Sequence, residues 1–288
     1  MMKRTIGQTG RSVFCIGLGG MPLSIEGRPD EKTAISVIHA AWDAGVDFLD
    51  IANVYCLDQQ DIGHNERLIA KALKLWGKPS ENIMIATKGG LSRPRGDWTS
   101  LASPKELRRA CERSLKDLQL ETLFLYQLHA VDPHVPFLDS LGELIKLKKE
   151  GKILHIGLSN ITPVLLESAL QVTRIESVQN QCNVFYQRDL RNGLIELCSR
   201  YEITYIAYSP VGGSLGHLRV SQDPLLMRLA AQYDTSPYCV ALNWLLQLGK
   251  NLLPIPGASR IESILDSIRA DKISLHPEDM LKIQNIHL

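Results

Sequence analysis

The sequence predicts an α/β protein, a (β/α)8 TIM barrel with an N-terminal β-hairpin and a C-terminal extra helix. Three observations predict this fold: eight β-rich segments recur along the chain, amphipathic helical patterns separate them, and no linker or low-complexity stretch interrupts the series. Apolar strands that alternate with amphipathic helices are typical of a parallel sheet covered by helices. We therefore expect residues 1–288 to form a single barrel domain, because closed α/β barrels of about 250 residues are common.

The predicted strands are short runs of mainly apolar residues. In chain order they read SVFCIGLG, VDFLDI, IMIATK, LFLYQLH, ILHIGLSN, SVQNQC, TYIAYS and LLPIPG. At the two ends of the chain, RTIGQTGRSV predicts the hairpin and HPEDMLKIQNI predicts the extra helix.

Helix start and stop signals lie between these strands. Asp30 is the expected N-cap of a helix that Gly45 stops, and Ser103 opens another helix in the capping box SPKE. The Ser-Pro start recurs at Ser236, before an apolar helix that ends at Gly249. The remaining helices are predicted over residues 66–75, 135–149, 162–172 and 189–201, and in the segment SRIESILDSIRA.

An open, doubly wound sheet is the alternative fold. Its nucleotide-binding fingerprint, G-x-G-x-x-G, would have to fall on GLGGMP, where Pro22 stands at the position of the last glycine. The barrel is therefore the preferred fold.

The composition is that of an ordinary globular protein, with 44% hydrophobic residues, 22% charged residues and a net charge of +1. This charge gives no basic surface for nucleic acid, and no apolar run approaches the roughly 20 residues that cross a membrane. The start of the chain lacks the apolar stretch of a signal peptide. The six cysteines are scattered, so we expect reduced thiols in a cytoplasmic protein, with neither disulfides nor a metal site.

Polar residues end six successive predicted strands. The active site of a (β/α)8 barrel lies at the carboxyl ends of its strands, so these side chains are expected at one rim. A single polar residue at a strand end is often structural, but six at a common rim indicate a functional site. The residues are Asp50, Lys88, His129, Ser159 with Asn160, Gln179, and Tyr208 with Ser209.

Four side chains near this rim suggest proton-transfer chemistry. The phenol of Tyr55, five residues after Asp50, has an ordinary pKa of about 10 and is a poor acid near neutrality. The ammonium of Lys88 would lower that pKa, and the carboxylate of Asp50 would keep the buried ammonium charged. His129 could donate a hydrogen bond to a carbonyl oxygen beside Tyr55. Such a group can polarise and protonate a carbonyl but has no source of electrons, so a hydride-donating cofactor is implied.

These residues, in this order, resemble the aldo-keto reductase superfamily. The family's D-x-A-x-x-Y appears as DIANVY, its strand-end T-K as ATKGG, and its active-site His is followed by a long similar stretch that ends in LSN. SVQNQCNVFY, AYSPVGG and IPGAS stand in the places of three further cofactor-binding segments, so the resemblance covers essentially the whole chain.

The resemblance implies reduction of an aldehyde or ketone with NADPH, with NADH as the alternative cofactor, and without a metal. It assigns Tyr55 as general acid, Lys88 and Asp50 as its partners, and His129 as the residue that orients the carbonyl. Ser159, Asn160 and Gln179 would bind the nicotinamide carboxamide, and Tyr208 would stack on the ring. Asp50 is also expected to contact the cofactor. The other residues expected there are Gly20 and Met21 near the nicotinamide ribose, Ser209, Pro210, Val211 and Gly212 in the loop SPVGGSLGHL over the pyrophosphate, and Pro256, Gly257 and Ala258 at the adenosine phosphate.

The adenosine end departs from the family pattern. Arg260 is the only basic candidate for the 2′-phosphate, and the pair Asp266-Ser267 replaces the Glu-Asn that touches adenine in relatives. The preference for NADPH over NADH is therefore a family expectation that these residues support only in part.

Two other functions compete with this hypothesis. A metal-dependent hydrolase could use His129, Asp132 and His134, but no H-x-H ends the first strand. A cofactor-binding accessory subunit with little turnover, known among relatives of these reductases, would carry the same four side chains. We expect a small carbonyl compound as the partner, with neither nucleic acid nor membrane. The sequence predicts neither the particular substrate nor the oligomeric state.

Three further features of the site region are open. The segment GLSRPRGDW with Trp98 could border the substrate pocket, whereas its arginines, Arg93 and Arg95, are expected in a solvated loop. Cys56 and Cys182 follow predicted site residues, but a small apolar role is preferred to a redox role.

Overall fold

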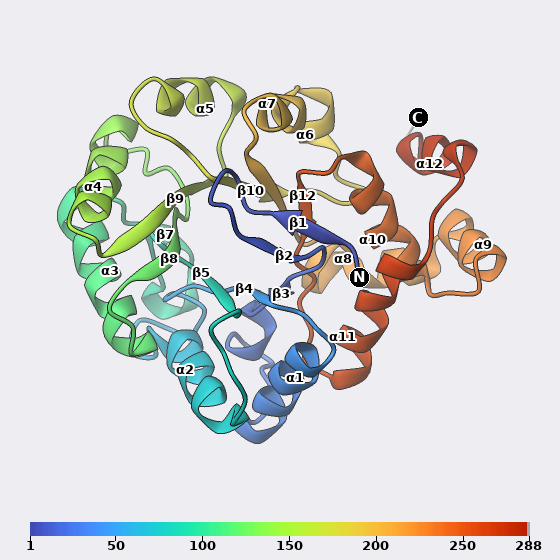
Figure 1. The fold of residues 1–288 in the computed structure, drawn as a ribbon, viewed down its shortest axis with the longest axis horizontal. Helices are drawn as coiled ribbons and strands as arrows, with labels where there is room; N and C mark the ends of the chain where they lie inside the picture. Colours follow the sequence, from blue (N-terminus) through green and yellow to red (C-terminus); the bar gives the residue numbers. More distant parts are fainter. Residues whose placement is uncertain (287–288) are drawn as a thin grey trace.

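The structure is a computed structural model that describes residues 1–286, without the side chains of residues 214 and 215. Eight parallel strands form one sheet that curls into a barrel, with the helices around it (Figure 1). The barrel closes where the Gly17 and Gly19 amides donate to the Pro254 and Pro256 carbonyls, both at 3.0 Å. The strands, in spatial order, are β3 (Leu18–Gly19), β4 (Phe48–Asp50), β5 (Met84–Gly89), β8 (Leu123–Leu128), β9 (Ile153–Ser159), β10 (Ser177–Gln181), β11 (Thr204–Tyr208) and β12 (Leu252–Pro254). The predicted (β/α)8 barrel is confirmed.

The helices surround the sheet, and those over residues 224–232 and 277–284 pack on other helices outside this ring (Figure 1). They are α1 (Glu31–Asp43), α2 (His64–Trp76), α3 (Pro104–Leu118), α4 (Phe137–Lys149), α5 (Pro163–Leu170), α6 (Arg188–Arg191), α7 (Leu194–Arg200), α8 (Gly213–Gln222), α9 (Pro224–Gln232), α10 (Pro237–Leu248), α11 (Ile261–Ile268) and the C-terminal α12 (Pro277–Gln284), with short 3-10 turns η1 (Met21–Leu23), η2 (Pro94–Gly96) and η3 (Arg269–Lys272). Every helix within residues 1–286 is too short or too polar to cross a lipid bilayer.

The predicted caps account for the helix starts. Asp30 accepts a hydrogen bond from the Thr33 amide at 3.0 Å, and Ser103 accepts one from the Glu106 amide at 3.4 Å. Each bond satisfies one of the amides that the first turn of a helix leaves without a partner. The expected C-terminal helix is α12.

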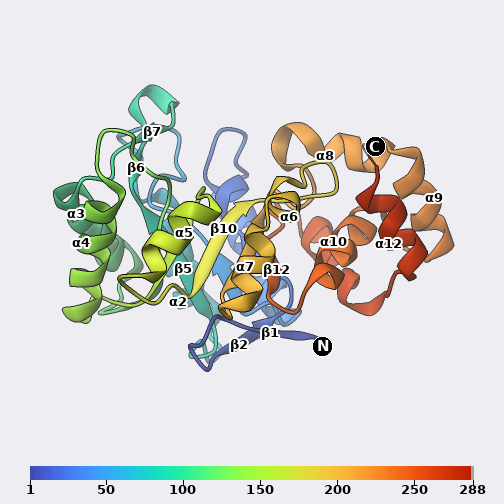
Figure 2. The same cartoon turned by 90° about the horizontal axis from the view of Figure 1, so that it is seen from above.

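The N-terminal hairpin, strands β1 (Lys3–Thr5) and β2 (Ser12–Phe14), covers one end of the barrel (Figure 2). Its residues Ile6 and Val13 are fully buried against apolar side chains of the barrel interior, such as Phe48 and Leu253. The opposite end carries the loops after the strands, including a second hairpin made of β6 (Leu91–Ser92) and β7 (Thr99–Ser100). One end is therefore apolar and closed, and polar residues collect at the other.

Three sequence expectations are corrected. The first predicted strand is divided, because the chain pairs with β1 up to Phe14 and enters the barrel only at Leu18. The helix predicted over residues 189–201 is two helices, since Gly193 has the left-handed φ of 81° between them. The expected loop SPVGGSLGHL becomes helix α8 from Gly213, directly after a left-handed Gly212, and α9 follows it from a cap at Asp223. The hairpin of β6 and β7 was not predicted from the sequence.

Candidate active site

Parallel strand register brings the predicted catalytic residues together. Asp50, the last residue of β4, lies opposite Ala86 of β5, and Lys88 lies two residues farther along that strand. His129 follows β8 directly and is held by the bond from its amide to the Gly89 carbonyl, at 2.8 Å. Tyr55 returns to the same rim through a turn in which its amide donates to the Ala52 carbonyl.

The ammonium of Lys88 is the centre of the site. It donates to the Asp50 carboxylate at 2.5 Å, to the Tyr55 hydroxyl at 3.0 Å and to the Ile51 carbonyl at 3.0 Å. Lys88 is fully buried, and Asp50 and Tyr55 are nearly so. A buried ammonium is stable only when its charge is paired and its three donors have acceptors, and both conditions are met here.

The electrostatics of the pair keep both protons in place. Burial acts to lower the pKa of Lys88, but Asp50 and Tyr55 together raise it above its ordinary value, so the side chain remains an ammonium. Burial raises the pKa of Tyr55 above 10, and Lys88 opposes this shift. Lys88 thus acts in the direction expected from the sequence, but burial outweighs it. The phenol keeps its proton until a stronger base, such as a developing alkoxide, lies beside it.

His129 stands next to Tyr55. The two rings meet edge to face, with centroids 5.7 Å apart and planes at 83°. Burial, together with the positive charge of Lys88, holds the pKa of His129 well below its ordinary 6.5. The imidazole is therefore neutral and can donate from only one of its nitrogens.

A polar network inside the barrel supports Asp50. Its second oxygen accepts hydrogen bonds from the amides of Gln179, at 2.6 Å, and Gln127, at 3.1 Å. The hydroxyl of Ser177 in turn donates to the Gln127 amide oxygen at 3.1 Å. A Cβ on Gly157 would lie 2.3 Å from the Ser177 hydroxyl, so glycine makes room for this network.

Gln127 and Ser177 were missed by sequence reasoning. The only signal was a glutamine in the middle of the apolar run LFLYQLH. Gln179, in contrast, was expected at the nicotinamide carboxamide, and here its amide N–H is directed to Asp50.

The next layer of the rim is more accessible. Asn160 and Ser209 follow β9 and β11 with φ of 56° and 48°, values that non-glycine residues adopt rarely. The Tyr208 hydroxyl donates to the Asn160 side-chain oxygen at 2.9 Å, and the Asn160 amide donates to the Ser159 hydroxyl at 3.1 Å. Burial raises the pKa of Tyr208 to about 12.

The residues expected beside the nicotinamide ribose join this rim. The Gly20 amide donates to the Asp50 carbonyl at 2.8 Å, and the Gly20 carbonyl accepts from buried Asn65 at 3.0 Å. Met21 packs against the small apolar group that contains Tyr55. Asn65 was not expected from the sequence.

The residues expected at the pyrophosphate and adenosine follow the last two strands of the barrel, β11 and β12. Gly257 is exposed and forms a bridge with Gly19, whereas its neighbours Pro256 and Ala258 are buried. Pro210 is also buried, and Val211 and Gly212 are partly exposed. Arg260 is exposed at the N-cap of α11, where no side chain caps the helix.

Asp266 and Ser267 are engaged within the protein. Asp266 accepts a hydrogen bond from Ser236 at 2.5 Å, which ties α11 to α10. The Ser267 hydroxyl donates to the Ser263 carbonyl of the preceding turn at 2.9 Å. Their contact with adenine stays a prediction.

Two glycines expected at the cofactor lie against other parts of the chain. A Cβ on Gly257 would lie 2.6 Å from a ring carbon of Pro22, and one on Gly212 would lie 2.5 Å from the Gly216 backbone. Glycine is therefore needed at both places for the close packing of the protein's own chain at the mouth. The Asn160 amide donates to the His129 carbonyl at 3.0 Å, and this contact connects Asn160 and its partner Tyr208 to the buried tetrad of Asp50, Tyr55, Lys88 and His129.

The hairpin of β6 and β7 lies beside the tetrad, and one expectation about it is wrong. Trp98 is exposed, with its ring centroid 6.2 Å from that of Tyr55 and 6.3 Å from that of His129. Arg95 is exposed, as expected for a solvated loop, but Arg93 is buried. Its guanidinium lies on the Trp98 ring, 4.0 Å from the centroid, and donates to the Cys56 carbonyl at 3.2 Å.

The cysteines and the loop after β8 have structural roles. All six cysteines are free and buried, and burial raises the pKa of Cys56 to about 11 and of Cys182 to about 12. Such thiols are poor nucleophiles, which favours the apolar role.

In the loop after β8, Asp132 accepts hydrogen bonds from the Ala102 and His134 amides at 3.0 Å. In the part of the chain that the structure describes, no group of three His, Cys, Asp or Glu side chains could hold a metal.

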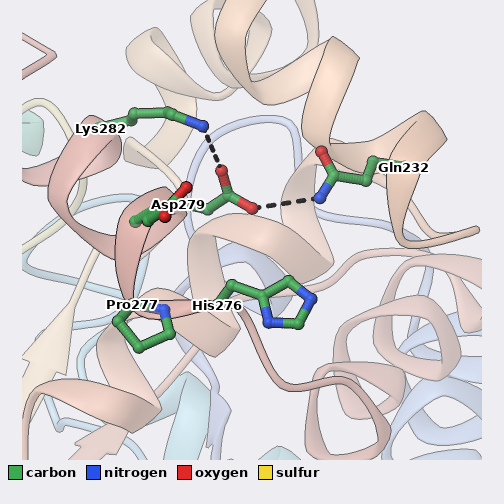
Figure 3. Close-up of a pocket in the computed structure, with 6 residues that line it drawn as sticks. Gln232, His276, Pro277, Asp279 and Lys282 are labelled. Atoms are coloured by element: carbon green, nitrogen blue, oxygen red, sulfur yellow. Dashed lines mark hydrogen bonds and ion pairs between the residues drawn. The ribbon is translucent and has the colours of Figure 1, made fainter.

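A separate surface pocket lies between α9 and α12 (Figure 3). Its volume is about 420 Å³, and it is lined by Gln232, His276, Pro277, Glu278, Asp279 and Lys282. Asp279 accepts hydrogen bonds from Lys282 at 2.8 Å and Gln232 at 3.2 Å, so these groups satisfy one another. None of the predicted site residues lines this pocket.

The comparison with known proteins agrees with the geometry. Residues 15–287 match the aldo/keto reductase family. The chain belongs to this family. This aldo/keto reductase is 34% identical to Probable aldo-keto reductase 1 of Glycine max, over 96% of this chain and 86% of that protein. It is 31% identical to Pyridoxine 4-dehydrogenase of Escherichia coli, over 96% of both.

A solved structure extends the likeness to the fold. The crystal structure of a thermostable aldo-keto reductase with the inhibitor epalrestat has a TM-score of 0.85 at 27% identity, over 99% of this chain and 100% of that one. The present aldo/keto reductase is thus an oxidoreductase of this family, with its polar rim at the strand ends where barrel enzymes have their active sites.

Proposed function

We propose that this aldo/keto reductase reduces the carbonyl of an aldehyde or ketone to an alcohol, with NADPH as the cofactor and Tyr55 as the general acid. The observation that carries the proposal is the buried ammonium of Lys88, which donates to both Asp50 and Tyr55. A structural ion pair would not need a phenol as its third partner at the mouth of a barrel.

Each side chain of the tetrad has a role in this reaction. The single N–H of neutral His129 holds the carbonyl oxygen of the substrate next to Tyr55. When bound, the nicotinamide supplies a hydride to the carbonyl carbon. As negative charge develops on the carbonyl oxygen, Tyr55 gives it the phenolic proton, and the ammonium of Lys88 stabilises the resulting phenolate at close range. Asp50 keeps Lys88 in place.

The residues of the outer rim would hold the cofactor. Ser159, Asn160 and Gln179 are proposed to bind the carboxamide and Tyr208 to stack on the nicotinamide, which requires the hydrogen bonds among them to rearrange. Arg260, at the start of α11, is proposed to bind the 2′-phosphate. Its guanidinium and the backbone amides of the first turn of α11, which no side chain caps, would both attract the phosphate charge. NADH remains the second cofactor to compare.

The test is a panel of carbonyl compounds, followed through NADPH and NADH absorbance. Because the E. coli relative is named Pyridoxine 4-dehydrogenase, pyridoxine belongs in the panel with NADP+ as the oxidant. We expect reduction of at least one small aldehyde. A protein that binds NADPH but turns over no member of the panel would contradict the proposal and favour an accessory, cofactor-binding role.

A further inference from the structure

Three aromatic rings surround the place where the proposed carbonyl would lie. The ring centroids of Tyr55, His129 and Trp98 form a triangle with sides of 5.7, 6.2 and 6.3 Å. Tyr55 and His129 are buried, whereas Trp98 is 47% exposed. Trp98 is therefore the ring of this triangle that an incoming substrate meets first.

Arg93 fixes the position of this indole. Its guanidinium carbon lies 4.0 Å from the centre of the Trp98 ring, well within the range of a cation–π contact. The same guanidinium donates to the carbonyl of Cys56, the residue after Tyr55, at 3.2 Å. The Arg93 amide donates to the Gln59 side chain at 3.2 Å. Arg93 thus connects the hairpin that carries Trp98 to the loop that carries Tyr55.

The burial of Arg93 is unusual for a surface hairpin. The side chain is 6% exposed, its Nε atom has no hydrogen-bond partner, and no carboxylate of the described residues forms an ion pair with it. Buried arginines are normally paired with acids. The contacts of the Arg93 guanidinium are instead the face of the Trp98 indole and the Cys56 carbonyl.

The hairpin cannot hold Trp98 without help. It has only two pairs in register, Leu91 with Ser100 and Ser92 with Thr99. Isolated two-stranded hairpins are marginally stable in water. The contacts of Arg93 therefore set the direction of the Trp98 ring.

We propose that Trp98 determines substrate specificity by packing against carbonyl compounds with a flat aromatic substituent, and that Arg93 is the positioning residue that holds it. This proposal rests on the proposed carbonyl reduction. A flat ring attached to the carbonyl can lie against the indole while the oxygen meets Tyr55 and His129. Aromatic contacts favour flat rings over saturated rings of the same size by roughly two- to twelve-fold in affinity.

The test compares benzaldehyde with cyclohexanecarbaldehyde, which differ in flatness but hardly in size. We expect Trp98→Leu to lower kcat/KM for benzaldehyde about three- to ten-fold more than for the saturated aldehyde, mainly through KM. Arg93→Met should change the ratio of kcat/KM for the two aldehydes in the same direction. The double variant should show nearly the same ratio as either single variant. Arg93→Lys keeps a cation near the indole and should recover part of the discrimination.

A matched control removes a different cation from a tryptophan. Lys78 lies over the Trp76 ring at 5.6 Å, on the outer surface of the barrel, so Lys78→Met should leave the substrate ratio unchanged. NADPH affinity, followed by fluorescence, should be the same in all variants. If Arg93→Met does not fold, Trp98→Leu and Arg93→Lys still decide the question.

The outcomes separate this inference from the proposed function. The wild-type protein could reduce both aldehydes while Trp98→Leu and Arg93→Met leave the ratio of the two kcat/KM values unchanged. That result would overturn the role of Trp98 and Arg93 and would leave the proposed function standing. Equal losses for both aldehydes would do the same. A wild-type protein that reduces no carbonyl compound at all would overturn the proposed function, and this inference with it.

Discussion

Glu66 should make the stability of this protein depend on pH. The side chain is fully buried in the first turn of α2, where one carboxyl oxygen accepts a hydrogen bond from Thr87 at 2.6 Å. Burial raises the pKa of this carboxyl from 4.5 to about 7, although the bond from Thr87 acts against the shift. Replacement by glutamine removes the titration and keeps an acceptor for Thr87.

The sign and size follow from proton linkage. Between pH 4.5 and about 7 the unfolded chain loses the Glu66 proton while the folded chain retains it, so the free energy of unfolding falls as the pH rises. Above pH 7 the whole cost is present. At about 1.4 kcal/mol for each pH unit, this interval corresponds to about 3 kcal/mol.

Urea unfolding of the wild type and Glu66→Gln, at pH 5 and pH 8, measures this effect. We expect the variant to gain about 2 to 3 kcal/mol relative to the wild type between the two pH values. Glu196→Gln, at a position that is 78% exposed, is the matched control and should follow the wild type. Parallel curves for Glu66→Gln and the wild type would refute the reasoning.

Three further predictions concern the site. Because the pKa of His129 lies well below 6.5, we expect no change of kcat/KM near pH 6.5 that depends on this side chain. A change near pH 6.5 that is present in the wild type and absent in His129→Gln would mean that the imidazole titrates there. Gly157→Ala should lower the free energy of unfolding by about 1 to 3 kcal/mol, since its Cβ would lie 2.3 Å from the Ser177 hydroxyl, and an unchanged urea midpoint would contradict this. Arg260→Ala should raise the KM for NADPH more than the KM for NADH, and equal effects on both would remove Arg260 from the phosphate site.

Local signals predicted much of this fold. The caps at Asp30 and Ser103 and the stop at Gly45 depend on residues a few positions apart, and all three act where the sequence placed them. The Asn192-Gly193 pair was an available stop signal within residues 189–201 that was not used, and it divides α6 from α7. Polar strand ends predicted the rim because parallel strands finish on the same side of a barrel.

Contacts between distant segments could not be predicted from the sequence. The bond from Gln127 to Asp50 depends on which strand ends face each other across the barrel interior. The burial of Arg93 depends on how a short hairpin folds back over the loop after β4. In the sequence alone, each of these polar residues is equally compatible with exposure to solvent. Only the tertiary structure shows which group it contacts.

The turnover of Tyr55→Phe with NADPH tests the central claim most directly. This change removes the hydroxyl that Lys88 contacts at 3.0 Å and leaves the ring and the outer rim in place. We predict NADPH affinity close to that of the wild type, and a kcat lower by about 10²- to 10⁴-fold, the usual contribution of a general acid. A Tyr55→Phe variant that reduces its aldehyde within a few-fold of the wild-type rate would contradict the account.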